Sequence, residues 1–230
     1  MFEARVDPDM QGGNRMEHYK KRGRIAGILL LASTIITAFN SIHGYMQAGD
    51  TSAWAWLVYF FSSVSWIFSI LLSIGLITDN IILARVSVIV DLVYDVLSLI
   101  ITLILGSSTY SKSIGVLMLV SSVIPILIWM FILIGLFNRG KKARGFCLVA
   151  FGIEIAYMLT SYCHFIFRDG SLSSVIHNMS AYSFWSQLIV NLIGTMMFCA
   201  AIWFMGLYLQ NRLSAGSHMV DDASAVQPQD

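Results

Sequence analysis

Long apolar runs separated by short polar segments dominate this chain of 230 residues. A helix of ~20 residues, at a rise of ~1.5 Å per residue, crosses the ~30 Å hydrocarbon core of a bilayer. Six runs are longer than that, and they cover residues 24–46, 53–78, 81–106, 114–137, 144–167 and 184–209. The pattern therefore predicts an all-α, polytopic membrane protein with six transmembrane helices.

The amino-acid composition supports this fold class. Hydrophobic residues make up 57% of the chain and charged residues only 12%, whereas a soluble domain averages about 25% charged residues. The three cysteines all fall within apolar runs, and the chain contains no Cys-x-x-Cys pair. The sequence therefore predicts neither a disulfide framework nor a metal site.

Motifs of well-known enzyme classes are missing from the sequence. It contains no His-Glu-x-x-His, no Gly-x-Ser-x-Gly, no P-loop and no dinucleotide-binding fingerprint. We therefore expect no catalytic residues of these classes, no cofactor and no nucleic-acid partner.

Basic residues lie unevenly on the two sides of the predicted spans. If the N-terminus is cytoplasmic, the outer loops hold only Lys112 and Arg168. The inner segments hold eleven basic residues: Arg5, Arg15, Lys20, Lys21, Arg22, Arg24, Arg139, Lys141, Lys142, Arg144 and Arg212. This positive-inside bias predicts a plasma or cytoplasmic membrane protein with both termini in the cytoplasm.

Three regions follow from this topology: a basic N-terminal segment (1–23), a membrane domain (24–209) and a disordered cytoplasmic tail (210–230). The basic segment and the apolar run after it also resemble a secretory signal peptide. No convincing small-x-small cleavage site follows, and five further spans come after it. We therefore expect the first helix to be retained.

The third apolar run carries a stripe of polar side chains. Ser87, Asp91, Asp95, Ser98 and Thr102 are separated by four, four, three and four positions. On a helix this spacing places them along one face. An ionised side chain in hydrocarbon costs ~2.5–3.5 kcal/mol or more, so an intramembrane carboxylate indicates a functional site. Asp91 and Asp95 are therefore candidate site residues.

Two other predicted helices carry similar stripes. In the fifth, Glu154, Tyr157, Ser161 and His164 share one face. Glu154 is a candidate site residue, and His164 is a candidate proton relay because imidazole titrates near neutral pH. In the sixth, Asn191 is either a site residue or a residue that joins helices through hydrogen bonds.

The spans also suggest a threefold repeat of helical hairpins. Arg24, Arg85 and Arg144 each open an odd-numbered span, 61 and 59 residues apart. The even-numbered spans end in similar triplets: Ile74-Gly75-Leu76, Ile134-Gly135-Leu136 and Met205-Gly206-Leu207. Three parallel hairpins of roughly 60 residues would account for these matches. Chance similarity is the alternative, because membrane helices use a small set of residues.

The repeat places three polar residues at equivalent positions. Ten residues after each arginine it reaches Thr34, Asp95 and Glu154. Ten helical residues span ~15 Å, about half of the hydrocarbon thickness. The repeat therefore predicts that these side chains meet near the middle of the membrane, around a shared polar interior.

Two functions fit this pattern. In a small transporter or channel-like protein, Asp95 and Glu154 bind or exchange a small cation, a proton or a small solute in a wet interior. In a non-catalytic membrane subunit, with an assembly, sensing or accessory role, these carboxylates pair with groups of this chain, a partner membrane protein or a second copy. A membrane enzyme has less support, because Glu154 and His164 lie ~15 Å apart along one helix.

Overall fold

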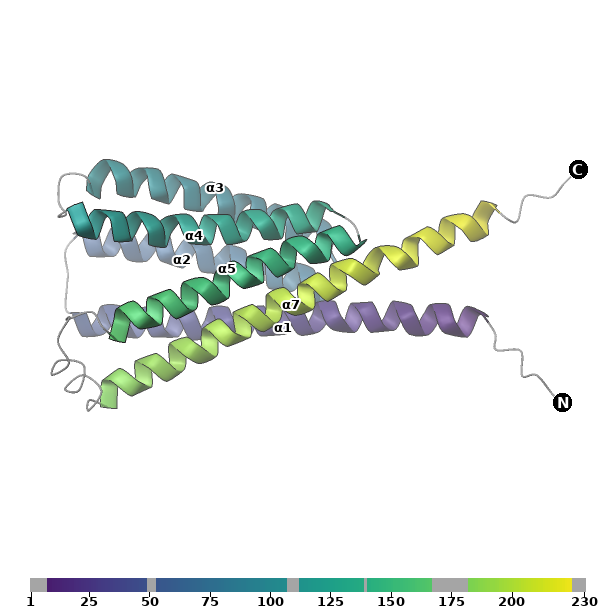
Figure 1. Ribbon diagram of the computed structural model, residues 1–230, viewed down its shortest axis with the longest axis horizontal. Coiled ribbons are helices and arrows are strands. Elements are labelled where there is room, and N and C mark those ends of the chain that lie inside the picture. Colours follow the sequence, from purple (N-terminus) through teal and green to yellow (C-terminus); the bar gives the residue numbers. More distant parts are fainter. Residues whose placement is uncertain (1–7, 49–52, 107–111, 139, 167–181, 225–230) are drawn as a thin grey trace, which may run out of the picture.

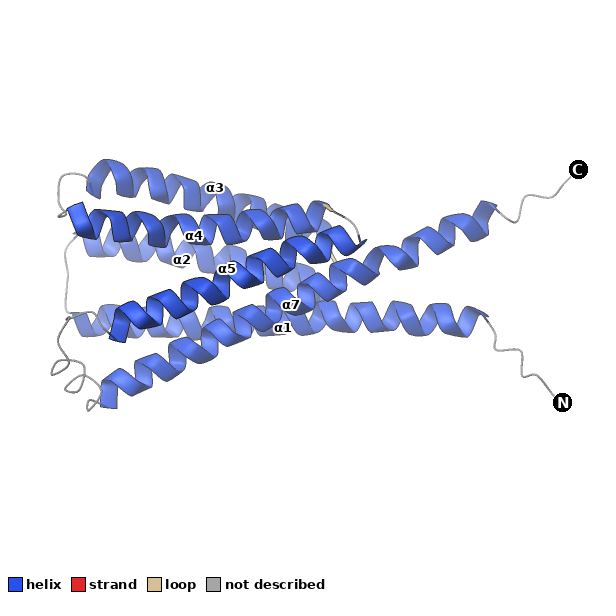
Figure 2. Cartoon of the chain, viewed as in Figure 1, coloured by secondary structure: helices blue, strands red, loops and turns tan. Residues whose placement is uncertain are grey.

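The computed structural model describes residues 8–48, 53–106, 112–138, 140–166 and 182–224. All regular structure in these residues is helical, as Figure 2 shows. The helices are α1 (Pro8–Ala48), α2 (Ala53–Ile77), α3 (Ile81–Gly106), α4 (Lys112–Phe137), α5 (Gly140–Ile166) and α7 (Tyr182–Ser224). For these residues the prediction of an all-α fold with six helices is confirmed.

The first and last helices are longer than the sequence predicts. α1 already begins at Pro8, and α7 continues to Ser224. Proline suits the first turn of a helix, because the N–H that it lacks would have no partner there. The prediction of a disordered tail from residue 210 is corrected over residues 210–224. Hydropathy marks where a helix leaves the apolar phase, and no proline ends this helix before Pro228.

The helices run side by side in a bundle (Figure 1), and their contacts connect them as a ring in chain order. Each helix packs against the one before it, and α7 returns to pack extensively against α1. α4 also touches α7 across the ring. Short connections explain this order, because helices joined by a few residues pack as antiparallel neighbours.

The turn between α2 and α3 consists of Thr78, Asp79 and Asn80. Asp79 has a φ of 57°, in the left-handed region that aspartate tolerates better than most residues. The amide of Asn80 donates to the carbonyl of Gly75 at 2.8 Å, and its side-chain oxygen accepts from the amide of Leu83 at 3.0 Å. The first bond closes α2 and the second caps α3.

Small residues allow adjacent helices to approach closely. A side chain on Gly75 of α2 would collide with the backbone of Ala84 in α3. A Cβ on Gly135 of α4 would lie 3.1 Å from the sulfur of Cys147 in α5. Close backbone approach increases van der Waals contact, which drives helix association where lipid replaces water.

Three segments of the described chain are long and apolar enough to cross a membrane: Glu17–Ile42, Gly140–Ser161 and Leu188–Arg212. Ser63–Ile77 and Val123–Phe137 are apolar but shorter over the residues described. Every helix also exposes large apolar side chains on the outside of the bundle. A folded chain in water rarely exposes so much apolar surface, and these faces are compatible with insertion into a bilayer.

Replacing Gly27 by alanine should destabilise the packing of α1 on α2. The new Cβ would lie 2.6 Å from the carbonyl oxygen of Ser73, and neither backbone can yield without separating the helices. We expect the free energy of unfolding in detergent to fall by ~1–3 kcal/mol, measured by denaturant titration. Gly152→Ala is the matched control, because nothing lies within 4 Å of that position. It should leave stability unchanged or raise it by up to ~1 kcal/mol.

Candidate functional site

The polar stripe of α3 is buried over its first half. Asp91 is only 2% exposed, and the hydroxyl of Ser65 in α2 donates to its Oδ1 at 2.8 Å. Ser87 is buried as well, and its hydroxyl donates to the carbonyl of Leu83 in its own helix at 2.7 Å. The side chain of Thr102 lies outside the described residues. Asp91 therefore has a structural partner on the adjacent helix.

Asp95 and Glu154 have no such partner within the part of the chain that the structure describes. Neither carboxyl group forms a hydrogen bond or an ion pair with another described residue, although Glu154 is only 9% exposed. No fully buried polar atom of a described side chain is left unpaired. The oxygens of both carboxyl groups must therefore retain some accessible surface. Water, a proton or a group from another molecule is needed to stabilise them in an apolar medium.

These two carboxyl groups lie on different helices. Asp95 lies on α3, which packs against α2 and α4, and Glu154 lies on α5, which packs against α4 and α7. Glu154 is close enough to Cys199 of α7 to interact with it electrostatically. Both helices thus pack against α4, and a shared polar interior stays a prediction.

The other candidate residues join helices or bond within one helix. Asn191 of α7 accepts a hydrogen bond from the side-chain amide of Asn40 in α1 at 2.5 Å. Thr34 is buried but donates to the carbonyl of Leu30 in its own helix at 2.9 Å. His164 belongs to α5, but its side chain is not described, so the proton-relay hypothesis stays a prediction.

A small cavity lies between α1, α2, α4 and α7. Its volume is about 10 Å³, which is at the lower limit for a single water molecule. The side chains that line it are all apolar, with Leu30, Leu72, Trp129 and Ile202 among them. The described side chains around this cavity therefore offer no polar group to its interior.

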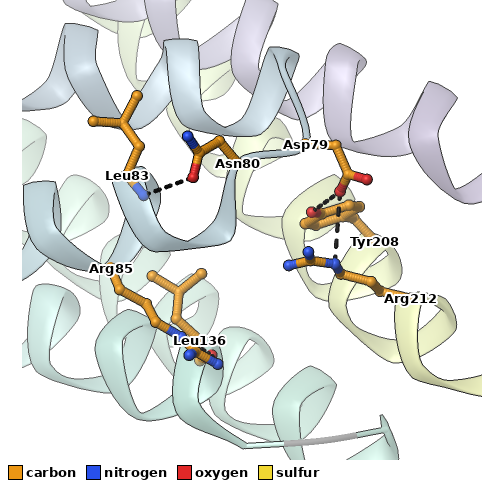
Figure 3. Close-up of polar contacts among 7 residues, drawn as sticks. All are labelled: Asp79, Asn80, Leu83, Arg85, Leu136, Tyr208 and Arg212. Atoms are coloured by element: carbon orange, nitrogen blue, oxygen red, sulfur yellow. Dashed lines mark hydrogen bonds and ion pairs between the residues drawn. The ribbon is translucent and has the colours of Figure 1, made fainter. Parts of the chain in front are cut away.

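A polar cluster that the sequence did not predict joins three parts of the chain. Figure 3 shows Asp79, in the turn between α2 and α3, facing two side chains of α7. The hydroxyl of Tyr208 donates to Asp79 Oδ1, and Nε of Arg212 lies 3.6 Å from the same oxygen. The ring of Tyr19 in α1 lies 6.1 Å from that of Tyr208. The cluster joins α1 and α7 to this turn.

Arg85 makes a second contact that the sequence did not predict. Its Nε and Nη2 donate to the carbonyl of Leu136 at 3.0 and 2.9 Å (Figure 3). The guanidinium also lies 4.6 Å from the ring centre of Phe137. Arg85 therefore caps the last turn of α4, where carbonyl groups lack partners within the helix.

Comparisons with protein-family models, with curated proteins and with solved structures give no match to this chain. Within the described residues, no group of three His, Cys, Asp or Glu side chains is arranged to hold a metal ion. The main feature of the candidate site is that the carboxyl groups of Asp95 and Glu154 have no partner among the described residues.

Replacing Tyr208 by phenylalanine should loosen the polar cluster. The change removes the hydroxyl that donates to Asp79, and a hydrogen bond to a charged group contributes ~1.5–3 kcal/mol. We expect the free energy of unfolding to fall by that amount in a denaturant titration. Tyr157→Phe is the control, because its hydroxyl makes no hydrogen bond to a described residue. Equal effects of the two substitutions would contradict this role of the cluster.

A double-mutant cycle should detect the bond between Ser65 and Asp91. Ser65→Ala and Asp91→Leu each remove one partner, and we expect a coupling energy of ~0.6 kcal/mol, with ~1.7 kcal/mol as the upper limit. Ser73→Ala provides the comparison, because the Ser73 hydroxyl bonds to the carbonyl of Ser69. Its effect should be additive with Asp91→Leu. Additivity in both cycles would show that the Ser65 contact contributes nothing.

Proposed function

We propose that this chain is a membrane protein with six spans and both termini on the cytoplasmic side. Six helices in a closed ring, each with exposed apolar side chains, support six spans. The distribution of basic residues supports the orientation, because cytoplasmic segments carry an excess of lysine and arginine. The basic residues of α1 and of the start of α5 lie toward one end of the bundle, and the turn between α2 and α3 lies at the same end.

We also propose that the chain consists of three related hairpins. Gly75 of α2 packs on Ala84 of α3, and Gly135 of α4 packs near Ala143 of α5. In both cases the small residue on the second helix directly precedes one of the repeated arginines. The third hairpin departs from this pattern, because its Gly206 faces α5 instead of α1. Two equivalent contacts support the repeat, and this departure limits it.

Both repeated arginines that have described contacts reach the next helix. Arg85 of α3 bonds to the carbonyl of Leu136 near the end of α4. Arg144 of α5 donates to the side chain of Gln210 in α7 at 3.1 Å. These contacts support a common role for the arginines in joining the two helices of a hairpin.

The function that this geometry supports best is that of a non-catalytic membrane subunit that binds a partner through its helices. One observation carries this proposal: the carboxyl groups of Asp95 and Glu154 have no partner among the described residues, and their oxygens keep some accessible surface. A basic, hydroxyl or amide side chain of a partner helix would satisfy either acid within the membrane.

Transport of a small cation, a proton or a small solute has weaker support. It requires a wet path through the bundle, and the cavity between α1, α2, α4 and α7 is small and apolar. Flux measurements separate transport from partner binding.

Affinity purification of the tagged full chain from its native membrane tests the proposal. We expect a stoichiometric membrane partner with the wild type, and its loss with Asp95→Leu or Glu154→Leu. Asp91→Leu is the matched control, because this carboxyl group already has Ser65 as its partner. It should lower stability but retain the partner.

Two results would contradict a partner-binding role. The first is a wild-type protein that purifies alone under mild solubilisation. The second is a proton or cation flux in liposomes that the wild type supports and that Asp95→Asn or Glu154→Gln abolishes, which would establish transport instead.

A further inference from the structure

Six basic residues lie on two of the helices that contact α7: Lys20, Lys21, Arg22 and Arg24 of α1, and Lys141 and Lys142 of α5. We call them the basic belt. Gly23 of α1 packs against Tyr208, and Gly206 lies against Arg144 of α5. The two halves of the belt therefore flank the same stretch of α7, at one level of the bundle.

The belt differs from the arginines that hold the fold together. Arg85 bonds to the carbonyl of Leu136, Arg144 to Gln210, and Arg212 pairs with Asp79. By contrast, no belt residue forms a hydrogen bond or an ion pair with another described residue. Lys21, Arg24, Lys141 and Lys142 are exposed. The charges of the belt are thus available to an external anion.

The belt lies where the exposed apolar surface begins. Ile28, one turn after Arg24, is 58% exposed, and Val149, two turns after Lys142, is 44% exposed. A membrane helix places such a change from cationic to apolar surface at the level of the lipid headgroups. An anion that belongs to a lipid can reach the belt while its acyl chains cover the apolar surface next to it.

We propose that the basic belt binds the phosphate headgroups of anionic phospholipids. This rests on the proposed membrane insertion and not on partner binding by Asp95 or Glu154. An acidic protein could also bind the belt through opposite charge. The belt, however, is spread on both sides of α7 at one depth. That arrangement fits several small anions in the plane of a bilayer better than one large partner. Each lysine or arginine near an anionic surface is worth about fivefold in affinity.

The test uses the purified full chain in neutral detergent, titrated with phosphatidylglycerol or phosphatidylcholine. Bound lipid is counted by native mass spectrometry, and the melting temperature is followed in parallel. The wild type should bind phosphatidylglycerol preferentially and gain thermal stability from it. Lys141→Gln with Lys142→Gln should weaken phosphatidylglycerol binding by roughly 25-fold, from two charges at about fivefold each.

Three controls keep folding and topology apart from lipid binding. Lys141→Arg with Lys142→Arg keeps both charges and should restore the preference. Lys112→Gln with Arg168→Gln removes two charges that the sequence predicts on the opposite side, and it should leave binding unchanged. Arg212→Gln should lower the melting temperature equally in both lipids, because it breaks the contact with Asp79.

Three outcomes would overturn the proposal. One is equal binding of the two lipids by the wild type. Another is a preference for phosphatidylglycerol that survives neutralisation of all six belt residues. The third is an equal loss of binding in the Lys112 and Arg168 control, which would make the effect one of net charge alone.

Discussion

The need to pair polar groups away from water governs this structure. A polar side chain in an apolar medium is costly unless it is hydrogen-bonded, and the described helices meet this need at their contacts. Ser65 bonds to Asp91 between α2 and α3, and the hydroxyl of Ser33 donates to the carbonyl of Gly194 between α1 and α7 at 2.8 Å. Because these polar groups are paired, a carboxyl group without a partner is unusual in this bundle.

The helices were predictable from the sequence, because each depends on a long apolar run that lipid or a neighbouring helix can cover. Four of them, α2 to α5, begin and end within four residues of the predicted runs. The lengths of α1 and α7 were not predictable in this way. Hydropathy reports where a helix is apolar, whereas the helix itself continues as long as its backbone bonds are not interrupted.

The candidate site was predictable only in part. Spacing along a helix identified the polar face of α3, and the bond from Ser65 shows which helix that face contacts. Spacing cannot show which faces of different helices meet, so the meeting of Asp95 and Glu154 stays a prediction. Asp79 was missed because it lies in a short turn, and its partner Tyr208 is 129 positions away.

The unequal lengths of the helices have a mechanical consequence. α1 has 41 residues and α7 has 43, so each is over ~60 Å long, whereas the 25 residues of α2 span ~38 Å. Figure 1 shows both long helices running past the other four at one end and diverging there. They form a pair of stalks whose tips stand clear of the bundle. A small change in the angle at which the two helices cross would therefore displace their tips more than the residues near the crossing.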